Sequence, residues 1–414
     1  MDKKPPKEKP STFSILRRDR NLLLACLAGF AYTIGAGAVW FVLPTIATSF
    51  TTDIMLLVLL LSVPFFFSVL MSIPFGDLSD YIGRKPMCIL GVATLIPSGI
   101  MLLYSSDLAV FIVLSVTFGI SNALLNPTSR AYVMDLAPKE SASEYFGFLF
   151  SFVYLGASVG PLLAGFLVTD LISFNLNWIA LMVSISGIVS LFLFIAISET
   201  ILRKKSLKKG LNQIVIRDKL FLRAFRDFGK LKDIGILIVL VTFVISLVDG
   251  IIWTFEPLYY EELALDPAIG GILMFLLIMP MVLFQIPAGY LADKHGKFRV
   301  LLVGLAIAGT SFVLFGLLKS EMGLMITAFM TALGVAFTWP ALSGIVSDHC
   351  EKSCRGDVSG VWSTFMDIPN IIAPFMGGVI VALYSDYGAI FWVLGVVILI
   401  SIIPVIHISK RNSI

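Results

Sequence analysis

The segment that decides the fold is Gly76-Asp77-Leu78-Ser79-Asp80-Tyr81-Ile82-Gly83-Arg84-Lys85-Pro86, a charged stretch between two long apolar runs. A second copy, Gly289 to Lys297, repeats its Gly, Leu, Asp, Gly and basic positions 213 residues later. We interpret each copy as a short charged turn that joins two apolar segments. A loop repeated at a fixed register indicates that the whole architecture is duplicated.

The composition is that of a membrane protein. Of the 414 residues, 58% are hydrophobic and only 14% are charged, and the mean hydropathy is +0.95, which lies outside the range of soluble domains. Apolar runs of about 20 residues, long enough to cross a bilayer as helices, occur twelve times. The predicted spans are 20–48, 53–76, 86–104, 107–135, 143–169, 174–198, 234–260, 267–289, 298–318, 322–348, 356–384 and 388–408. Because these runs lack apolar/polar alternation, the predicted fold class is all-α with twelve transmembrane helices, not a β-barrel.

The positions of the basic residues predict how the chain is oriented. Of the 30 Lys and Arg residues, 28 fall in the two tails, the central loop and the loops that follow even-numbered spans. Cytoplasmic loops carry such a positive excess. We therefore expect a multi-pass protein of the cytoplasmic membrane with both termini in the cytoplasm. Because the basic residues are spread along one membrane face, they do not indicate nucleic-acid binding.

The register of 213 residues holds through most of both halves. Matched pairs include Trp40 and Trp253, Pro44 and Pro257, Pro127 and Pro340, and Pro161 and Pro374. We predict five parts: a disordered tail 1–19, a six-helix bundle 20–198, a linker 199–233, a second six-helix bundle 234–408 and a tail 409–414. The linker is either an interfacial amphipathic helix or a plain basic connection. Six spans per half give both halves the same orientation, with a substrate site between them.

The repeated segments resemble the G-x-x-x-D-[RK]-x-G-[RK]-[RK] loop of the major facilitator superfamily. The matching positions are Gly76, Asp80, Gly83 and Arg84 in the first copy, and Gly289, Asp293, Gly296 and Lys297 in the second. Tyr81 replaces the basic residue of the motif in the first copy. An Arg side chain can fork onto a carboxylate, and we expect Arg84 to pair with Asp135 and Lys297 with Asp348. The resemblance implies that these clusters act as gates that hold an outward-open state; the alternative is that they are topological anchors.

The fifth span carries a second motif. Gly147, Gly156, Gly160, Pro161 and Gly165 are similar to the superfamily's antiporter signature, with Ala164 as the one departure. Small residues four apart let two helices approach closely. The motif favours an exporter of the antiporter type, although generic helix packing gives the same pattern. Ser115 stands where drug and proton antiporters of the family usually carry an Arg, which puts the usual coupling geometry in doubt.

Charged residues inside the spans are the main candidates for coupling, because charges in a bilayer are costly and by default functional. Asp249 and Glu256 lie with Trp253 on one face of the seventh span, at i, i+4 and i+7. Asp367 is a further acid in the eleventh span. Burial disfavours the charged form of a carboxyl group, so these three acids are the predicted proton-binding residues.

The cavity is predicted from the spans that line it in the resembled family, the first, fourth, seventh and tenth. The candidates are Trp40, Asn122, Asn126, Arg130, Trp253 and Trp339. Arg130 and Asp367 each have two further interpretations, as a member of a structural ion pair and as a side chain at a span end that reaches the interface.

The predicted function is secondary active transport: a proton-coupled antiporter that exports hydrophobic or amphipathic small molecules by alternating access. The alternatives are a proton symporter or uniporter for a small polar or anionic metabolite, with Arg130 as the anion clamp, or a lipid-handling membrane protein. An enzyme is not expected, because no nucleotide-binding G-x-x-x-x-G-K-[ST] loop occurs and three His residues form no triad. We expect no cofactor beyond the proton gradient and no metal site, since His349, Cys350 and Cys354 lack a fourth ligand. The expected partners are a small-molecule substrate, protons and membrane lipids, and the expected state is a monomer.

Overall fold

The computed structural model describes residues 19–138, 142–168, 176–201, 231–349 and 355–412. Within these ranges the chain forms twelve long helices and no strand. They are α2 (Arg20–Thr48), α3 (Ile54–Ile82), α4 (Arg84–Leu102), α5 (Leu108–Leu136), α6 (Ala142–Leu167), α7 (Asn177–Ala196), α10 (Lys232–Glu262), α11 (Pro267–His295), α12 (Lys297–Leu317), α13 (Glu321–His349), α14 (Arg355–Tyr384) and α15 (Gly388–Asn412). All twelve are long and apolar enough to cross a bilayer. The predicted fold class is confirmed.

Several helices begin at a side-chain cap, whereas α4, α7, α10 and α12 have none at their N-cap residue. At one end of the molecule, Asp53, Asp107 and Asp266 accept hydrogen bonds from backbone N–H groups in the first turns of α3, α5 and α11. Each carboxylate satisfies donors that a helix start leaves unpaired. We call this the Asp53 end, and the opposite end, where α3 meets α4 and α11 meets α12, the Gly83 end.

The prediction of a charged turn over Gly76 to Pro86 was wrong. Helix α3 continues through this stretch to Ile82, and α4 begins at Arg84. Only Gly83 departs from helical geometry, with φ of 119°, and Gly296 does the same between α11 and α12 with φ of 97°. A positive φ suits glycine and few other residues, so one glycine replaces an entire loop in each half.

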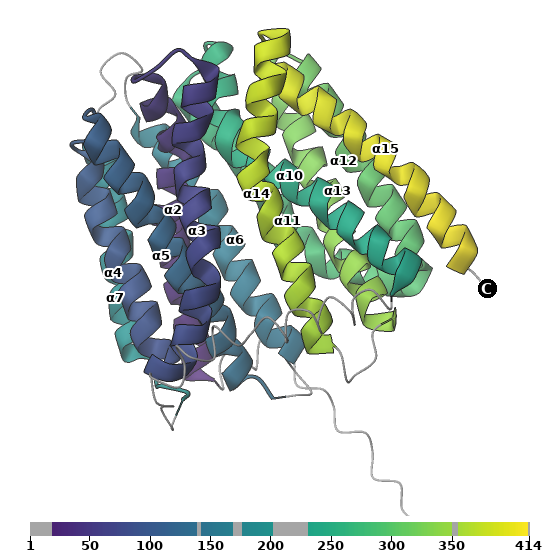
Figure 1. The fold of residues 1–414 in the computed structure, drawn as a ribbon, viewed down its shortest axis with the longest axis horizontal. Helices are drawn as coiled ribbons and strands as arrows, with labels where there is room; N and C mark the ends of the chain where they lie inside the picture. Colours follow the sequence, from purple (N-terminus) through teal and green to yellow (C-terminus); the bar gives the residue numbers. More distant parts are fainter. Residues whose placement is uncertain (1–18, 139–141, 169–175, 202–230, 350–354, 413–414) are drawn as a thin grey trace, which may run out of the picture.

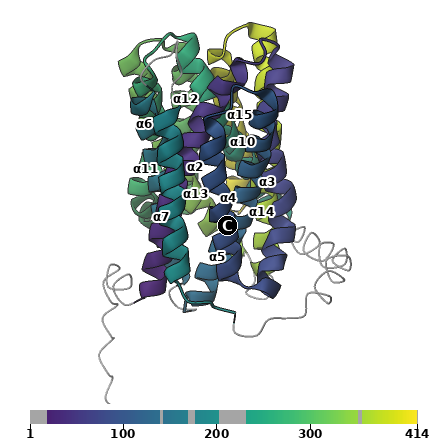
Figure 2. The ribbon, with the colours of Figure 1, turned by 90° about the vertical axis from the view of Figure 1, so that its left-hand side faces the viewer.

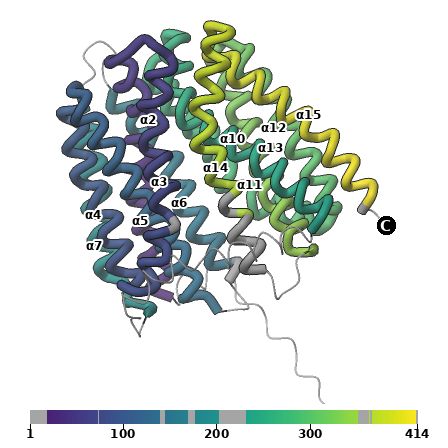
Figure 3. The backbone as a smooth tube through the Cα atoms, viewed as in Figure 1, coloured from purple at the N-terminus to yellow at the C-terminus, as the bar shows by residue number. Residues whose placement is uncertain are grey.

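The chain forms two halves of six helices each, α2–α7 and α10–α15 (Figure 1). Figure 2 looks onto the first half, with α4 and α7 toward the viewer. Among the described residues, the halves meet mainly through α6 with α11, α3 with α14, and α2 with α10. The tube in Figure 3 shows the two halves nearer to each other at the top, the Asp53 end, than at the bottom.

Several predicted features lie outside the described residues. They are the tail before Asp19, the linker segment 202–230 with its predicted amphipathic helix, and both Cys350 and Cys354.

Candidate functional site

The two halves are packed together at the Asp53 end. The rings of Phe41 in α2 and Tyr260 in α10 stack with centroids 5.6 Å apart. Beside them, the Thr45 hydroxyl donates a hydrogen bond to the Glu261 carboxylate. Nearby, the backbone of Gly165 in α6 lies directly against α11, where any added side-chain carbon would meet the Pro267 carbonyl. This end is therefore closed to passage between the halves.

Polar side chains in the middle of the spans are nevertheless exposed. Asn126 and Arg130 in α5, Asp249 in α10 and Asp367 in α14 are all accessible to solvent. Helix α10 contacts α2, α11, α13, α14 and α15, so an exposed residue on it faces the interior. Charged groups do not face hydrocarbon without a large cost. These four residues therefore line a solvent-accessible space between the halves, and because the Asp53 end is closed, that space opens toward the Gly83 end.

Arg130 carries the positive charge among these four residues and lies against α6. Its guanidinium carbon is 5.5 Å from the centroid of the Phe150 ring in α6, a cation–π distance. Arg130 forms no ion pair shorter than 4.0 Å with any residue that the structure describes. A cation that is solvated but not paired is free to attract an anionic group or to exchange partners.

Aromatic rings form the wall on the closed side. Trp40 packs against Phe65 at 4.3 Å, Phe118 at 5.1 Å and Trp253 at 6.4 Å between ring centroids. The Trp253 side chain also interacts with Asp249 one turn earlier in α10. Rings with a few convergent polar groups are the usual lining of a site for small organic molecules.

A second aromatic pair lies in the other half. Trp339 and Trp362 have ring centroids 6.4 Å apart, and the Trp362 indole donates a 2.7 Å hydrogen bond to Thr242. Trp339 was among the predicted cavity residues; Trp362 was not.

Glu256 is enclosed. It is 0% exposed, and neither carboxylate oxygen has a hydrogen-bond partner among the described residues. It lies on the α10 face that carries Trp253 and Tyr260, on the closed side of the solvent-accessible space. A buried carboxylate without partners is strongly unfavourable, so this enclosed position favours the neutral form of the carboxyl group.

Asn122 is separated from the other cavity candidates. It is buried, and its side-chain amide donates to the Phe118 carbonyl of its own helix at 2.9 Å. Asn126, one turn later, is exposed. The stripe of polar residues on α5 therefore reaches the solvent-accessible space only at its Gly83 side.

Both predicted ion pairs at the Gly83 end are present. The Arg84 guanidinium is 2.5 Å from Asp80 and 3.2 Å from Asp135, and Lys297 is 2.7 Å from Asp348. Each pair stays within its own half, while Asp293 is exposed. Their presence establishes contacts; the gate role stays a prediction.

Glu199 belongs to the first of these clusters and was missed. Its carboxylate accepts hydrogen bonds from the backbone N–H groups of Arg84 and Lys85 at 3.1 and 3.2 Å. Lys85 in turn donates to the carbonyls of Ile195 and Ile197 at the end of α7. The sequence did hold one sign of this contact. Glycine precedes α4 and cannot cap the helix with a side chain, so the first N–H groups of α4 need a partner from elsewhere in the chain.

The glycines of α6 serve two neighbours. A side-chain carbon at Gly156 or Gly160 would meet the backbone carbonyl of Phe30 or Ile34 in α2, and Gly165 lies against α11. Gly147 has open space beside it. Pro161 is part of the contact with α2, where it meets Gly37. The motif therefore allows close packing both within the first half and across the interface.

Two six-helix halves, joined at one end around a polar and aromatic space, define a multi-pass membrane transport protein. The chain belongs to the Major Facilitator Superfamily, whose family model matches residues 25–240 and 238–413. This assignment confirms the resemblance drawn from the repeated motif.

Known proteins with low sequence identity to this chain support the same family assignment. The class E tetracycline resistance protein of Escherichia coli is 24% identical over 390 residues, covering 91% of this chain and 92% of that protein. Multidrug resistance protein 2 of Bacillus subtilis (strain 168) is 25% identical over 334 residues, covering 79% and 80%. The solved structure of the xylose transporter XylE from E. coli, in a partially occluded inward open conformation, matches with a TM-score of 0.70 at 15% identity, covering 92% and 95%. The relatives are transporters, not enzymes.

Proposed function

We propose that this protein is a proton-coupled antiporter that exports hydrophobic or amphipathic small molecules. The observation that carries the proposal is Asp249, a carboxylate in the middle of α10 that is exposed to the space between the halves. An acid that is reachable by water inside a membrane span can load and release a proton. The tetracycline and multidrug resistance relatives support efflux as the direction.

The proposed working cycle is alternating access. The Gly83 end faces the cytoplasm in this proposal, because the basic residues gather there, and both termini are cytoplasmic. The conformation described is then open to the cytoplasm and closed to the outside. Rocking of one half against the other opens the Asp53 end and closes the Gly83 end.

In this cycle the two acids of α10 exchange protons with opposite sides of the membrane. Asp249 is open to the cytoplasmic side while Glu256 is enclosed. Opening of the Asp53 end exposes Glu256 to the outside. The proton then enters at one acid and leaves at the other, with Asp367 and Arg130 setting the charge balance between them.

The substrate binds against the aromatic wall. Trp40 and Trp253 offer flat apolar surfaces, backed by the buried rings of Phe65 and Phe118, and Asp249 lies at their edge. An amphipathic molecule with a cationic group would place its rings on the wall and its charge near Asp249, so binding of the substrate and binding of the proton compete for one carboxylate.

The test is transport in proteoliposomes. Purified protein is reconstituted with an imposed pH gradient, and movement of tetracycline and of ethidium is followed. We expect gradient-driven transport by the wild type and at least a tenfold loss in Asp249→Asn, which keeps the size but not the charge. Asp386→Asn is the matched control, because Asp386 pairs with Lys319 outside the cavity at 3.3 Å. Transport that is indifferent both to the gradient and to Asp249→Asn would reject the proposal.

A second candidate rests on Arg130. Its exposed guanidinium lacks an ion pair among the described residues and lies over Phe150, which suits an anionic substrate. Uptake or exchange of a small organic anion that is lost in Arg130→Gln, with ethidium transport unaffected by Asp249→Asn, would favour this function over drug export.

A further inference from the structure

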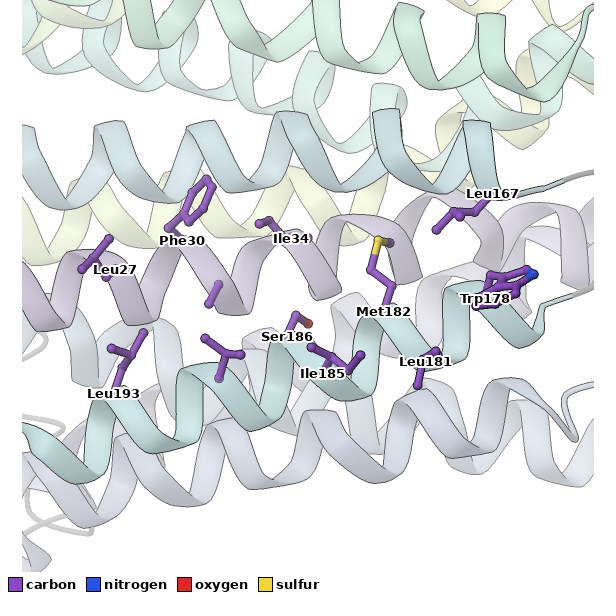
Figure 4. Close-up of a pocket in the computed structure, with 12 residues that line it drawn as sticks. Leu27, Phe30, Ile34, Leu167, Trp178, Leu181, Met182, Ile185, Ser186 and Leu193 are labelled. Carbon is purple, nitrogen blue, oxygen red and sulfur yellow. The ribbon is translucent and has the colours of Figure 1, made fainter.

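A groove runs along the outside of the first half, away from the central space. It lies between α2 and α7, with the end of α6 at its far margin (Figure 4). Its volume is about 550 Å³, within the range of sites that hold small ligands. Leu27, Phe30 and Ile34 line one side and Leu193, Ile185 and Leu181 the other. Helices α6 and α7 barely touch, so the groove is open toward the surrounding hydrocarbon.

A polar pocket lies at the Gly83 end of the same seam. It has a volume of about 480 Å³ and is formed by Asp19, Arg20 and Asn21 at the start of α2, Tyr145 at the start of α6, and Ala196 and Ser198 after α7. Leu193 of the groove and Ala196 of the pocket are three residues apart, less than one helical turn. An apolar groove thus leads directly into a polar pocket at the level where the helices end.

The donors of this pocket are available to a ligand. Asp19 is occupied, because it accepts from the Leu22 backbone and from the Tyr145 hydroxyl. Asn21 lines the pocket; its side-chain carbonyl oxygen accepts from the Ser198 backbone, and no hydrogen bond to a described residue occupies its NH₂ group. Arg20 is exposed and forms no ion pair with the part of the chain that the structure describes.

We infer that this seam binds one membrane glycerophospholipid. Its phosphate is held by Arg20 and Asn21, and one acyl chain lies in the groove along Leu193, Val189 and Phe30. The site lies on the back of α2, opposite the face that carries Trp40, so the inference does not depend on the proposed transport function.

Physical chemistry assigns the selectivity to the polar pocket. An acyl chain gains little by leaving other acyl chains, because lipid tails are as apolar as the groove. The acyl chain fills the groove, whose lining side chains would otherwise lose dispersion contacts. The guanidinium of Arg20 supplies charge-assisted hydrogen bonds to phosphate, which are about twice as strong as neutral ones. Removing the donors should therefore release the lipid, although the groove stays intact.

The equivalent corner of the second half is built differently. There α10 begins and α15 ends, and Arg411 forms an ion pair with Asp233 at 3.1 Å. That arginine is already neutralised by a partner in the chain, whereas Arg20 is not. The second half thus provides an internal control for a basic residue at the membrane surface.

The experiment uses the full chain in lipid nanodiscs with a phospholipid that carries a photoreactive diazirine in the middle of its acyl chain. After irradiation, cross-linked peptides are mapped by mass spectrometry. We expect cross-links on Phe30, Val189 and Leu193, and a reduction of about tenfold in Arg20→Ala/Asn21→Ala, the size expected for loss of charged hydrogen bonds. Arg20→Lys keeps the positive charge but loses the bidentate guanidinium donors, and it should retain part of the cross-linking. Arg411→Ala should change nothing.

Three outcomes would overturn the inference. The first is cross-linking of the groove that is unchanged in Arg20→Ala/Asn21→Ala while the unfolding temperature matches the wild type. The second is an equal loss in Arg411→Ala, which would indicate a general surface-charge effect. The third is the absence of groove cross-links while millimolar inorganic phosphate binds the wild type and not Arg20→Ala/Asn21→Ala, which would assign the polar pocket to a free anion. Cross-links lost only in the Arg20 and Asn21 variants support the lipid site even if no transport substrate is found.

Discussion

Glu256 in the second half occupies the position of Leu43 in the first, 213 residues earlier. Both side chains are buried. The two halves are therefore closely packed at this level, with an apolar side chain in the first half and a carboxyl group in the second. A leucine needs no partner there, whereas the carboxyl group of Glu256 has none among the described residues. The residue therefore lowers the stability of the closed Asp53 end, a cost that the proposed role in proton exchange would explain.

The first prediction concerns this residue. Glu256→Leu should raise the free energy of unfolding by about 1–3 kcal/mol, because it removes an unsatisfied buried polar group and keeps an apolar side chain of similar size. Thermal unfolding of the purified protein, followed by tryptophan fluorescence, measures the change. Glu262→Leu is the control and should lower stability, since Glu262 accepts from the Tyr387 backbone at 3.1 Å. Equal destabilisation by both substitutions would contradict the assignment.

The residues of the solvent-accessible space were partly predictable. Asp249, Arg130, Asn126 and Asp367 were found because charged and polar groups are rare in spans. Thr45 and Glu261 were not, since each looks like an ordinary residue at a helix end. Their hydrogen bond joins two helices 216 residues apart, and no local pattern in a sequence reports such a pairing.

At the scale of elements, the single-glycine junctions differ between the halves. Gly83 and Gly296 have similar positive φ values. A side-chain carbon at Gly83 would meet the Glu199 carboxylate, whereas at Gly296 nothing described lies within 4 Å. Backbone strain is therefore common to both positions, and the clash is confined to one.

The second prediction separates these two effects. Gly296→Ala should destabilise the protein by about 1–2 kcal/mol through the positive φ alone. Gly83→Ala should cost more, because it also displaces Glu199 from the start of α4 and removes a helix cap of about 1 kcal/mol. Equilibrium unfolding in detergent with added denaturant gives both values. A smaller loss for Gly83→Ala than for Gly296→Ala would contradict the capping role of Glu199.

Helix boundaries were predicted well where the helix ends with its apolar run, and poorly where the helix continues through charged residues. The first span was predicted as 20–48 and α2 is Arg20–Thr48. By contrast, α3 extends six residues beyond the predicted end at 76, because a helix that leaves the bilayer can continue with polar residues. Hydropathy locates the membrane, whereas the helix ends only where backbone geometry changes, at Gly83.

At the scale of the whole molecule, the two halves touch mainly through small or flat surfaces. Gly378 in α14 lies against Val58 in α3, and Gly165 lies against Gly271. Such contacts part without breaking ion pairs, and the described ion pairs each lie within one half. This arrangement suits rigid movement of one half against the other. Which end is open was not predictable, because both end states use the same helices.

The third prediction tests the movement directly. In a background without the native cysteines, Thr45→Cys and Glu261→Cys linked by a short bifunctional thiol reagent should hold the Asp53 end closed. Transport should fall to background and return when a cleavable link is reduced. Lys319→Cys with Asp386→Cys is the matched control, since this pair lies within the second half and linking it should leave transport active. Transport that continues at full rate with the first pair linked would contradict alternating access.

The spacing of the two acids on α10 has an electrical consequence. Asp249 and Glu256 are seven residues apart, about 10 Å of helix rise, or about a third of a hydrocarbon core of about 30 Å. A charge that crosses the whole core gains about 2.3 kcal/mol per 100 mV, so a proton that passes between these acids gains about 0.8 kcal/mol per 100 mV. Under the proposed coupling, the membrane voltage, and not the pH difference alone, drives part of each transport cycle.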